Sequence, residues 1–496
     1  MAALILVGMM LDSNTCYRAL RARDARFDGR FYVAVSSTRI YCRPVCTVKP
    51  PKRENCRFYP SAAAAESGGY RPCLRCRPEL APGNASIDAT SRVAQAAASL
   101  IEDRALDEEG LDAVAARLGI TDRHLRRAFG AEFGVSPVEF AQTQRLLLAK
   151  RLLTDTAMPV TEVAYASGFR SLRRFNALFK QRYRMQPSRL RTHMHESGAA
   201  SSDALNFELS FRPPYDWAAV CAFLGARAIA GVETVEEGRY RRTVRVMANG
   251  KPQLGWVEIS LSPKKPALRV TVAASLAKAL PPVLSRVKAL MDLACNPAEV
   301  ALALGADRSA LGALAKRRPG LRVPGAFDGF EVAVRAILGQ QVTVAAARTV
   351  AGRFAAAFGD PLETPFSSLN KIFPSAEKIS GLPYGHIARL GMPGARARTV
   401  LALARAVAGG ELALMPNADI DATLDKLRAL PGVGEWTAQY IAMRALAWPD
   451  AFPHTDLGVI KALGEKNPQR VLAAGEAWRP WRAYAVMHLW NSLTKE

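Results

Sequence analysis

The sequence predicts a multidomain α+β protein. We expect a small cysteine-rich domain, an all-α region, an antiparallel sheet with helices, and a second all-α region. Three observations predict this arrangement. The chain has 496 residues, which is too long for one ordinary hydrophobic core. Six of its eight cysteines lie within the first 76 residues. Apolar and polar residues alternate in β-type runs between residues 207 and 273, and the segments on both sides have helical patterns.

The composition favours a polyanionic partner. The formal net charge is +23, and basic residues outnumber acidic ones in both halves of the chain. Such an excess is typical of nucleic-acid binding, although charge that serves solubility alone is a plainer explanation. No apolar run reaches the roughly 20 residues that cross a bilayer, so we expect no membrane partner. The apolar segment Met1–Met10 lacks the basic start and cleavage site of a secretory leader, and we expect a cytoplasmic protein.

The cysteines form two close pairs. Cys42 and Cys46 occur in Cys-Arg-Pro-Val-Cys, and Cys73 and Cys76 in Cys-Leu-Arg-Cys. Each pair closes a short loop, and four thiolates at this spacing suit one tetrahedral Zn²⁺. The pattern leaves two interpretations open, a chemically reactive site and a purely structural zinc ribbon. Cys16 and Cys56 fall outside the motif and receive no role.

The segment Phe31–Leu80 resembles the N-terminal domain of the Ada-type adaptive-response methyl acceptors. The resemblance implies a domain over residues 1–80. It implies that Cys42 is both zinc ligand and acceptor of a methyl group from a methyl phosphotriester in DNA, and that the other three cysteines are ligands. Methylation turns a thiolate into a thioether and removes one negative charge, so we expect it to tighten DNA binding.

Two short helix pairs follow, about fifty residues apart. Each has a glycine between its helices, Gly119 in the first and Gly168 in the second, and Thr121 and Ser171 are suitable N-caps for the helices after the turn. This is the helix-turn-helix pattern, with a basic second helix. A helical spacer with solvated arginines is the plainer alternative. The candidate DNA-binding side chains are Arg123, Arg126, Arg127, Arg173 and Arg174.

The segment Val160–Leu190 resembles the signature of AraC-type activator domains. The resemblance implies a DNA-binding domain over residues 88–194, with promoter DNA as its partner and RNA polymerase as a further candidate partner. The small, polar residues of 195–204 predict a flexible linker. After it, four β-type runs predict the sheet: Phe207–Phe211, Tyr240–Met247, Trp256–Leu261 and Leu268–Ala273.

A glycine-rich hairpin stands out in the C-terminal half. In Leu430-Pro-Gly-Val-Gly434, Gly432 and Gly434 allow backbone N–H groups to approach a DNA phosphate. About twenty residues later, Asp456 is placed to cap a helix over Leu457–Leu463. An ionised carboxylate there could stabilise the positive charge that develops on a deoxyribose as its N-glycosidic bond breaks.

The chain from Leu205 to Glu496 resembles the bacterial 3-methyladenine DNA glycosylase II family, a group of helix-hairpin-helix glycosylases. The resemblance implies an antiparallel β-sheet/α subdomain over residues 205–285 and an all-α core over residues 286–496. It implies that Asp456 is catalytic and that an aromatic cleft receives the flipped base. It also places Gln341 near the side chain that enters the duplex gap, where some relatives carry an apolar residue. The implied cleft residues are Trp436, Tyr440 and Trp490.

The spacing and chemistry of these aromatic residues are compatible with a cleft but do not require one. Trp436 and Tyr440 lie four apart, on one face of a helix, where core packing is the ordinary explanation. Aromatic faces also attract a cationic alkylated base. Relatives that cut the DNA backbone carry a lysine where this chain has Trp436, so we expect a monofunctional glycosylase. A non-catalytic regulator that binds damaged DNA is the alternative. We expect a monomer.

Overall fold

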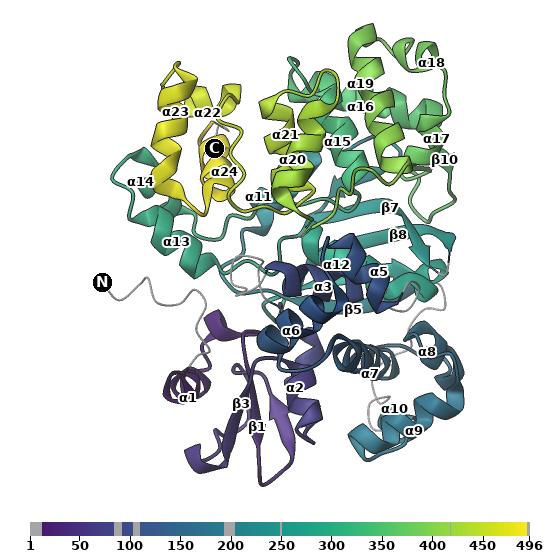
Figure 1. Ribbon diagram of the computed structural model, residues 1–496, viewed down its shortest axis with the longest axis vertical. Coiled ribbons are helices and arrows are strands. Elements are labelled where there is room, and N and C mark those ends of the chain that lie inside the picture. The colour runs from purple at the N-terminus through teal and green to yellow at the C-terminus, as the bar shows by residue number, and fades with distance from the viewer. Residues whose placement is uncertain are drawn as a thin grey trace. The chain divides into compact units, whose positions relative to one another are not determined.

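The computed structural model describes residues 12–83, 92–102, 110–192, 204–248, 250–416 and 418–493. The segment Met1–Met10 and residues 195–203 of the predicted linker lie outside these ranges. The chain forms two compact units. The first comprises residues 1–212, 246–253 and 262–285, and the second comprises residues 213–245, 254–261 and 286–496. Figure 1 labels their helices and strands.

The cysteine-rich domain contains a small sheet that the sequence analysis did not predict. Its strand order is β3-β1-β2-β4, and β2 runs parallel to β4, with Ile40 opposite Arg71 and Tyr41 opposite Pro72. Tyr41, on β2, is fully buried. The elements of this domain are α1 (Ser13–Ala22), β1 (Tyr32–Val35), β2 (Ile40–Cys42), β3 (Cys56–Tyr59), α2 (Ala62–Ser67) and β4 (Arg71–Pro72).

The helical region after it has the two predicted helix pairs. Thr121 accepts a hydrogen bond from the backbone N–H of His124, and Ser171 accepts one from Arg174, so both predicted N-caps are confirmed. Gly119 and Gly168 have φ values of 67° and 91°, which favour glycine at both turns. The helices are α3 (Arg92–Glu102), α5 (Leu111–Arg117), α6 (Asp122–Phe133), α7 (Pro137–Asp155), α8 (Val160–Ala166), α9 (Leu172–Tyr183) and α10 (Pro187–Thr192).

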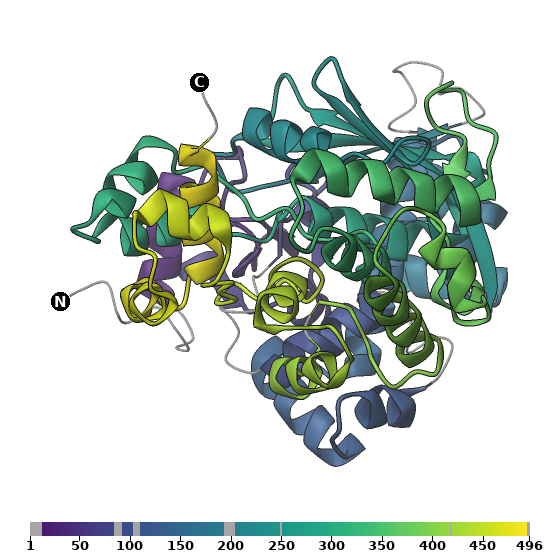
Figure 2. The ribbon, with the colours of Figure 1, turned by 90° about the horizontal axis from the view of Figure 1, so that it is seen from above.

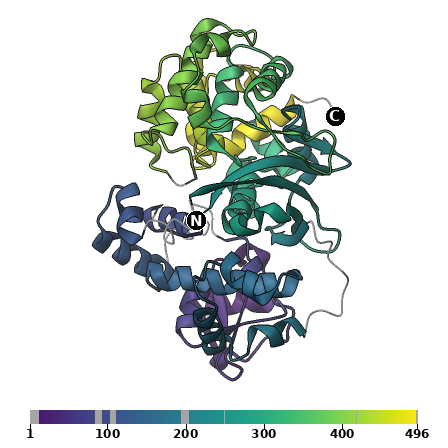
Figure 3. The same ribbon diagram turned by 90° about the vertical axis from the view of Figure 1, so that its right-hand side faces the viewer.

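A five-stranded sheet follows, with the order β5-β9-β8-β7-β6, drawn in teal in Figure 3. Strands β5 and β9 are antiparallel, as are β6 and β7. Four strands match the predicted runs, whereas β6 was missed because Glu-Thr-Val-Glu is short and polar. The strands are β5 (Ala204–Ser210), β6 (Glu233–Glu236), β7 (Arg239–Ala248), β8 (Lys251–Leu261) and β9 (Ala267–Ala273).

The C-terminal region is helical, as predicted, apart from the two-residue strands β10 (Asp360–Pro361) and β11 (Lys371–Ile372). Helix α15 is buried on almost every side, and α19 and α21 pack against it. The helices of the second unit and α12, which joins the two units, are α11 (Trp217–Ala226), α12 (Leu280–Leu290), α13 (Pro297–Gly305), α14 (Ala310–Arg317), α15 (Gly329–Leu338), α16 (Val344–Phe358), α17 (Ala376–Ser380), α18 (Tyr384–Ala388), α19 (Gly394–Ala408), α20 (Ile420–Ala429), α21 (Glu435–Arg444), α22 (Leu457–Leu463), α23 (Pro468–Gly475) and α24 (Arg482–Ser492).

Among the described residues, none of the helices combines the length and apolar character that a membrane crossing requires.

Candidate functional site

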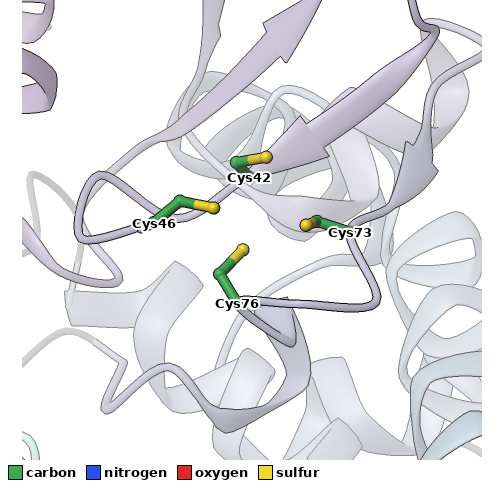
Figure 4. A group of neighbouring side chains, drawn as sticks. All are labelled: Cys42, Cys46, Cys73 and Cys76. Carbon is green, nitrogen blue, oxygen red and sulfur yellow. The ribbon is translucent and has the colours of Figure 1, made fainter. Parts of the chain in front are cut away.

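The sheet register brings the four predicted zinc ligands together. Because β2 and β4 are parallel neighbours, Cys42 and Cys73 leave the sheet at the same edge. The turns after these strands supply Cys46 and Cys76, and all four sulfur atoms lie within 4.8 Å of one another. Figure 4 shows the sulfurs gathered around a common centre. A tetrahedral zinc site with Zn–S bonds of about 2.3 Å needs sulfurs about 3.8 Å apart, so the group fits one Zn²⁺.

Backbone N–H groups support the thiolates. The N–H of Arg43 donates to Sγ of Cys76 at 3.3 Å, and that of Arg75 donates to Sγ of Cys73 at 3.4 Å. Hydrogen bonding among the thiols raises the pKa of Cys42, chiefly through Cys46, and lowers the pKa of Cys73, chiefly through Cys42. A bound zinc ion deprotonates its thiol ligands and keeps them nucleophilic.

The two remaining N-terminal cysteines lie apart from this group. Cys16 and Cys56 are buried in a separate apolar cluster that includes Phe31 and Val33. Burial raises the pKa of both thiols, to about 12 for Cys16. They are therefore ordinary apolar core residues.

The five candidate DNA-binding arginines are exposed. Phe175 and Phe179 form the buried face of α9, as predicted. Arg126 also pairs with Asp122, with Nε and Oδ1 3.0 Å apart. The exposed arginines near the starts of α6 and α9 are Arg123, Arg126, Arg127, Arg173 and Arg174.

The predicted hairpin joins α20 and α21, which lie side by side in Figures 1 and 2. Gly432 has a φ of 82°, and a Cβ there would clash with Oγ1 of Thr399. Gly434 has an ordinary φ of −92° and open space around its Cα. The side chain of Gln340 donates to the carbonyl of Gly432 at 2.9 Å and holds the turn. Only Gly432 is therefore required by the conformation of the hairpin.

Asp456 caps α22, and the predicted helix bounds of Leu457–Leu463 are confirmed. Its Oδ1 accepts hydrogen bonds from the backbone N–H groups of Gly458 at 2.8 Å and Val459 at 3.1 Å. Two indoles complete the arrangement: Trp436 donates to Oδ2 and Trp490 to Oδ1, both at 2.8 Å. Four N–H donors thus converge on one carboxylate.

The predicted aromatic residues form a continuous wall beside this carboxylate. The rings of Trp436 and Tyr440 stack at 5.4 Å, and Tyr440 lies 6.3 Å from Trp490. Asp456 and these three aromatic residues are each partly exposed. Phe223 of α11 stacks on Trp490 at 6.3 Å. Phe223 was not predicted from the sequence, because no local pattern connects α11 with α24.

Arginine side chains lie close to Tyr440 and Phe223. Arg444 donates from Nη1 to the Tyr440 hydroxyl at 2.9 Å, and its guanidinium lies 4.8 Å from the Phe223 ring centre. Burial alone raises the pKa of the Tyr440 phenol, but the charges of Arg444, Arg227 and Arg335 together hold it below its ordinary value. The i, i+4 spacing of Tyr440 and Arg444 was the signal that could have identified Arg444 from the sequence.

Gln341 lies in the turn between α15 and α16. It is exposed, with a left-handed φ of 54°, and the exposed Val342 follows it. The turn places both a polar and an apolar side chain at the surface.

Family models match four parts of the chain. They are the metal binding domain of Ada at residues 15–79, a helix-turn-helix domain at residues 114–193, the AlkA N-terminal domain at residues 206–328, and the HhH-GPD superfamily of base excision DNA repair proteins at residues 334–467. These matches and the sites above define a DNA repair protein of the helix-hairpin-helix class, fused to a zinc-binding regulatory half.

Sequence identity to individual proteins shows the family within this class. The chain is 41% identical to the probable bifunctional transcriptional activator/DNA repair enzyme AlkA of Mycobacterium tuberculosis, over 97% of each chain. It is 34% identical to DNA-3-methyladenine glycosylase 2 of Escherichia coli, over 57% of this chain and 96% of that protein. It is 36% identical to the E. coli bifunctional transcriptional activator/DNA repair enzyme Ada, over 30% of this chain and 39% of that protein. The chain belongs to the family of bifunctional AlkA-type transcriptional activator/DNA repair enzymes.

Proposed function

We propose that the C-terminal half excises alkylated bases from double-stranded DNA and leaves an abasic site. The observation that carries this proposal is the convergence of Trp436 and Trp490 on the carboxylate of Asp456. The same two indole rings that would stack on a flipped base hold the group that would stabilise its departure.

The chemistry follows from this placement. A base alkylated on a ring nitrogen carries positive charge, so aromatic faces attract it and the base leaves readily. As the N-glycosidic bond breaks, its electron pair passes to the base and positive charge develops on the sugar. The Asp456 carboxylate stabilises that charge and orients the water that adds to the sugar carbon. No lysine follows the hairpin at the position of Trp436, so the reaction ends at the abasic site.

The N-terminal half is proposed to repair methyl phosphotriesters and to regulate transcription. The Cys42 thiolate attacks the methyl carbon, an S–C bond forms, the C–O bond breaks, and the phosphodiester leaves as an anion. A bound Zn²⁺ keeps the thiol deprotonated. The methylated site carries one negative charge fewer, which favours DNA binding. The acceptor is consumed, so each chain reacts once.

The exposed arginines of α6 and α9 are proposed to bind promoter DNA. Removing an arginine that contacts phosphate weakens binding and reduces the salt dependence by about one ion. A salt titration of promoter affinity with Arg173→Ala tests this, and Lys180→Ala, exposed at the far end of α9, is the matched control. Equal affinities and salt slopes for both variants and the native chain would contradict the assignment.

The domain assignment proposed from the sequence is residues 1–80, 88–194, 205–285 and 286–496, with a linker at 195–204. The family matches at residues 15–79, 114–193 and 334–467 each fall within one of these domains. The match at residues 206–328 begins with the third domain and extends past residue 285. We further propose a cytoplasmic monomer that engages RNA polymerase when bound at promoters.

Release of free alkylated base from methylated duplex DNA by the full chain tests the catalytic half. We expect free base, abasic sites and no covalent adduct on borohydride treatment. A borohydride-trapped adduct would show strand-cleaving chemistry. Tight binding to methylated DNA without any release would instead favour a non-catalytic regulator that senses damage.

A further inference from the structure

A buried chain of hydrogen bonds connects the zinc site with the segment that follows β5. The backbone N–H of Arg43 donates to Sγ of Cys76, and its Nη1 donates to the carbonyl of Cys76 at 3.3 Å. The guanidinium of Arg43 also forms a two-point ion pair with Asp28, in which Nε lies 2.8 Å from Oδ1. Asp28 therefore fixes the position of Arg43, which in turn donates hydrogen bonds to the zinc ligand Cys76.

The next link comes from far along the chain. Nη2 of Arg212 donates to the backbone carbonyl of Asp28 at 2.7 Å and also to the carbonyl of Gly83. Arg212 is only 1% exposed. A Cβ on Gly29 would lie 2.9 Å from the backbone N of Gly83, so the loops at Asp28 and Gly83 meet backbone to backbone. Arg212 joins these two loops, one of which follows the zinc ligand Cys76 in sequence.

A second buried link joins the same regions. Arg77, directly after Cys76, pairs with Glu79 at 3.0 Å and with Asp155 of α7 at 2.8 Å. Lys150 of α7, 1% exposed, pairs with Glu79 at 2.6 Å. The neighbouring Arg151, 4% exposed, donates to the carbonyl of Glu208 on β5 at 2.5 Å and lies 4.9 Å from the Phe207 ring centre.

We propose that Arg212 is a positioning residue of the zinc site, so that the segment that opens the base-excision half completes the metal-binding domain. The residue lies inside the range matched by the AlkA N-terminal domain, residues 206–328, yet its hydrogen bonds go to the loops around Cys76. The proposal requires zinc binding but neither base excision nor methyl transfer, so it can fail or hold independently of both activities.

The physical basis is the precision that a metal site demands. Residues that orient metal ligands through hydrogen bonds change metal affinity by about ten- to a hundredfold when they are replaced. Without the Arg212 guanidinium, the carbonyls of Asp28 and Gly83 lose a charged donor that links their two loops. Asp28 is then no longer held in place, so its ion pair with Arg43 weakens. The hydrogen bonds from Arg43 to Cys76 weaken in turn.

The test is the rate at which the full-length, zinc-loaded chain releases zinc to an excess of a chromogenic chelator. We expect Arg212→Met, which keeps the apolar stem and loses the donors, to release zinc about tenfold faster than the native chain. The control is Arg269→Met, on the neighbouring strand β9, where the arginine is exposed and the native rate is expected. Native release by Arg212→Met would overturn the proposal.

A second measurement uses the native chain and so does not depend on the variant folding. Amide hydrogen exchange over residues 204–212 is followed before and after chelation of zinc. We expect faster exchange in this segment after chelation, with unchanged exchange in α24 as the reference. Unchanged exchange over residues 204–212, while the strands β1–β4 become labile, would show that the zinc site is independent of this segment and would overturn the proposal.

Discussion

Trp490 donates its indole N–H to Oδ1 of Asp456 across 2.8 Å, although the two residues lie on different helices and 34 positions apart. The ring of Trp490 also forms part of the aromatic wall beside Tyr440. We therefore expect the Trp490 side chain to have two roles: its ring contacts the base, and its N–H holds the Asp456 carboxylate.

Replacing Trp490 by phenylalanine separates these two roles. Trp490→Phe keeps an aromatic face and removes the donor to a charged acceptor, a loss of about 1.5–3 kcal/mol. Because the bond holds the carboxylate in place beside the reacting sugar, we expect kcat for base release to fall about ten- to a hundredfold. Single-turnover base release measures it. The control is Trp478→Phe, since Trp478 bonds Asp307 instead. A native rate for Trp490→Phe would show that the bond has no role in catalysis.

The two hairpin glycines are expected to differ. Alanine at Gly432 must adopt a φ of 82° and place its Cβ against Thr399, which costs about 1–3 kcal/mol. Alanine at Gly434 needs no left-handed φ, and its Cβ would have no atom within 4 Å. We therefore expect Gly432→Ala to lower the melting temperature and weaken binding to duplex DNA, and Gly434→Ala to keep the native melting temperature. Equal melting temperatures would contradict this account of the turn.

Cys42→Ser separates the two repair activities. Serine is a poor zinc ligand and a weak nucleophile, so transfer of a labelled methyl group to the protein is expected to be lost. Base release should persist at the native rate. Cys56→Ser is the matched control, because Cys56 is buried outside the zinc group and should leave methyl transfer intact. Methyl transfer by Cys42→Ser would assign the acceptor to another cysteine.

Glu66 is expected to make the stability of the N-terminal domains depend on pH. It is fully buried, where Tyr41 donates to Oε1 at 3.0 Å, and burial raises its pKa to about 7. Because this value lies above the unfolded value of 4.5, the folded state binds the proton more tightly. Stability from this group is full below about pH 4.5 and falls by up to about 3 kcal/mol as the pH rises to 7. Glu66→Gln should make the melting temperature depend less on pH than in the native chain. The same pH dependence in both proteins would contradict this role of Glu66.

Much of the fold was predictable where a local signal exists. Asp456 and the helix after it were predicted to the residue, because a capping carboxylate before an apolar run is a local feature. Thr121 and Ser171 were predicted for the same reason. The strands β1 to β4 have only two to four residues each and are too short for a recognisable alternation.

The contacts that build the sites were less predictable. Trp436 and Tyr440 share a helix face, so their stacking follows from spacing. The bonds from Trp490 to Asp456, the stacking of Phe223 on Trp490 and the contact of Arg212 with Asp28 join segments that are distant in sequence. Such contacts depend on tertiary packing, for which a single sequence carries no periodic signal.

The role of Asp456 is tested by comparing base release by the native chain and by Asp456→Asn from the same methylated duplex DNA. Asparagine is as good an N-cap as aspartate, so the variant should fold and bind DNA. We expect its single-turnover rate to fall by a factor on the order of 10²–10³, with DNA affinity retained. Native base release by Asp456→Asn, in protein shown to be folded, would contradict the assignment of the catalytic carboxylate.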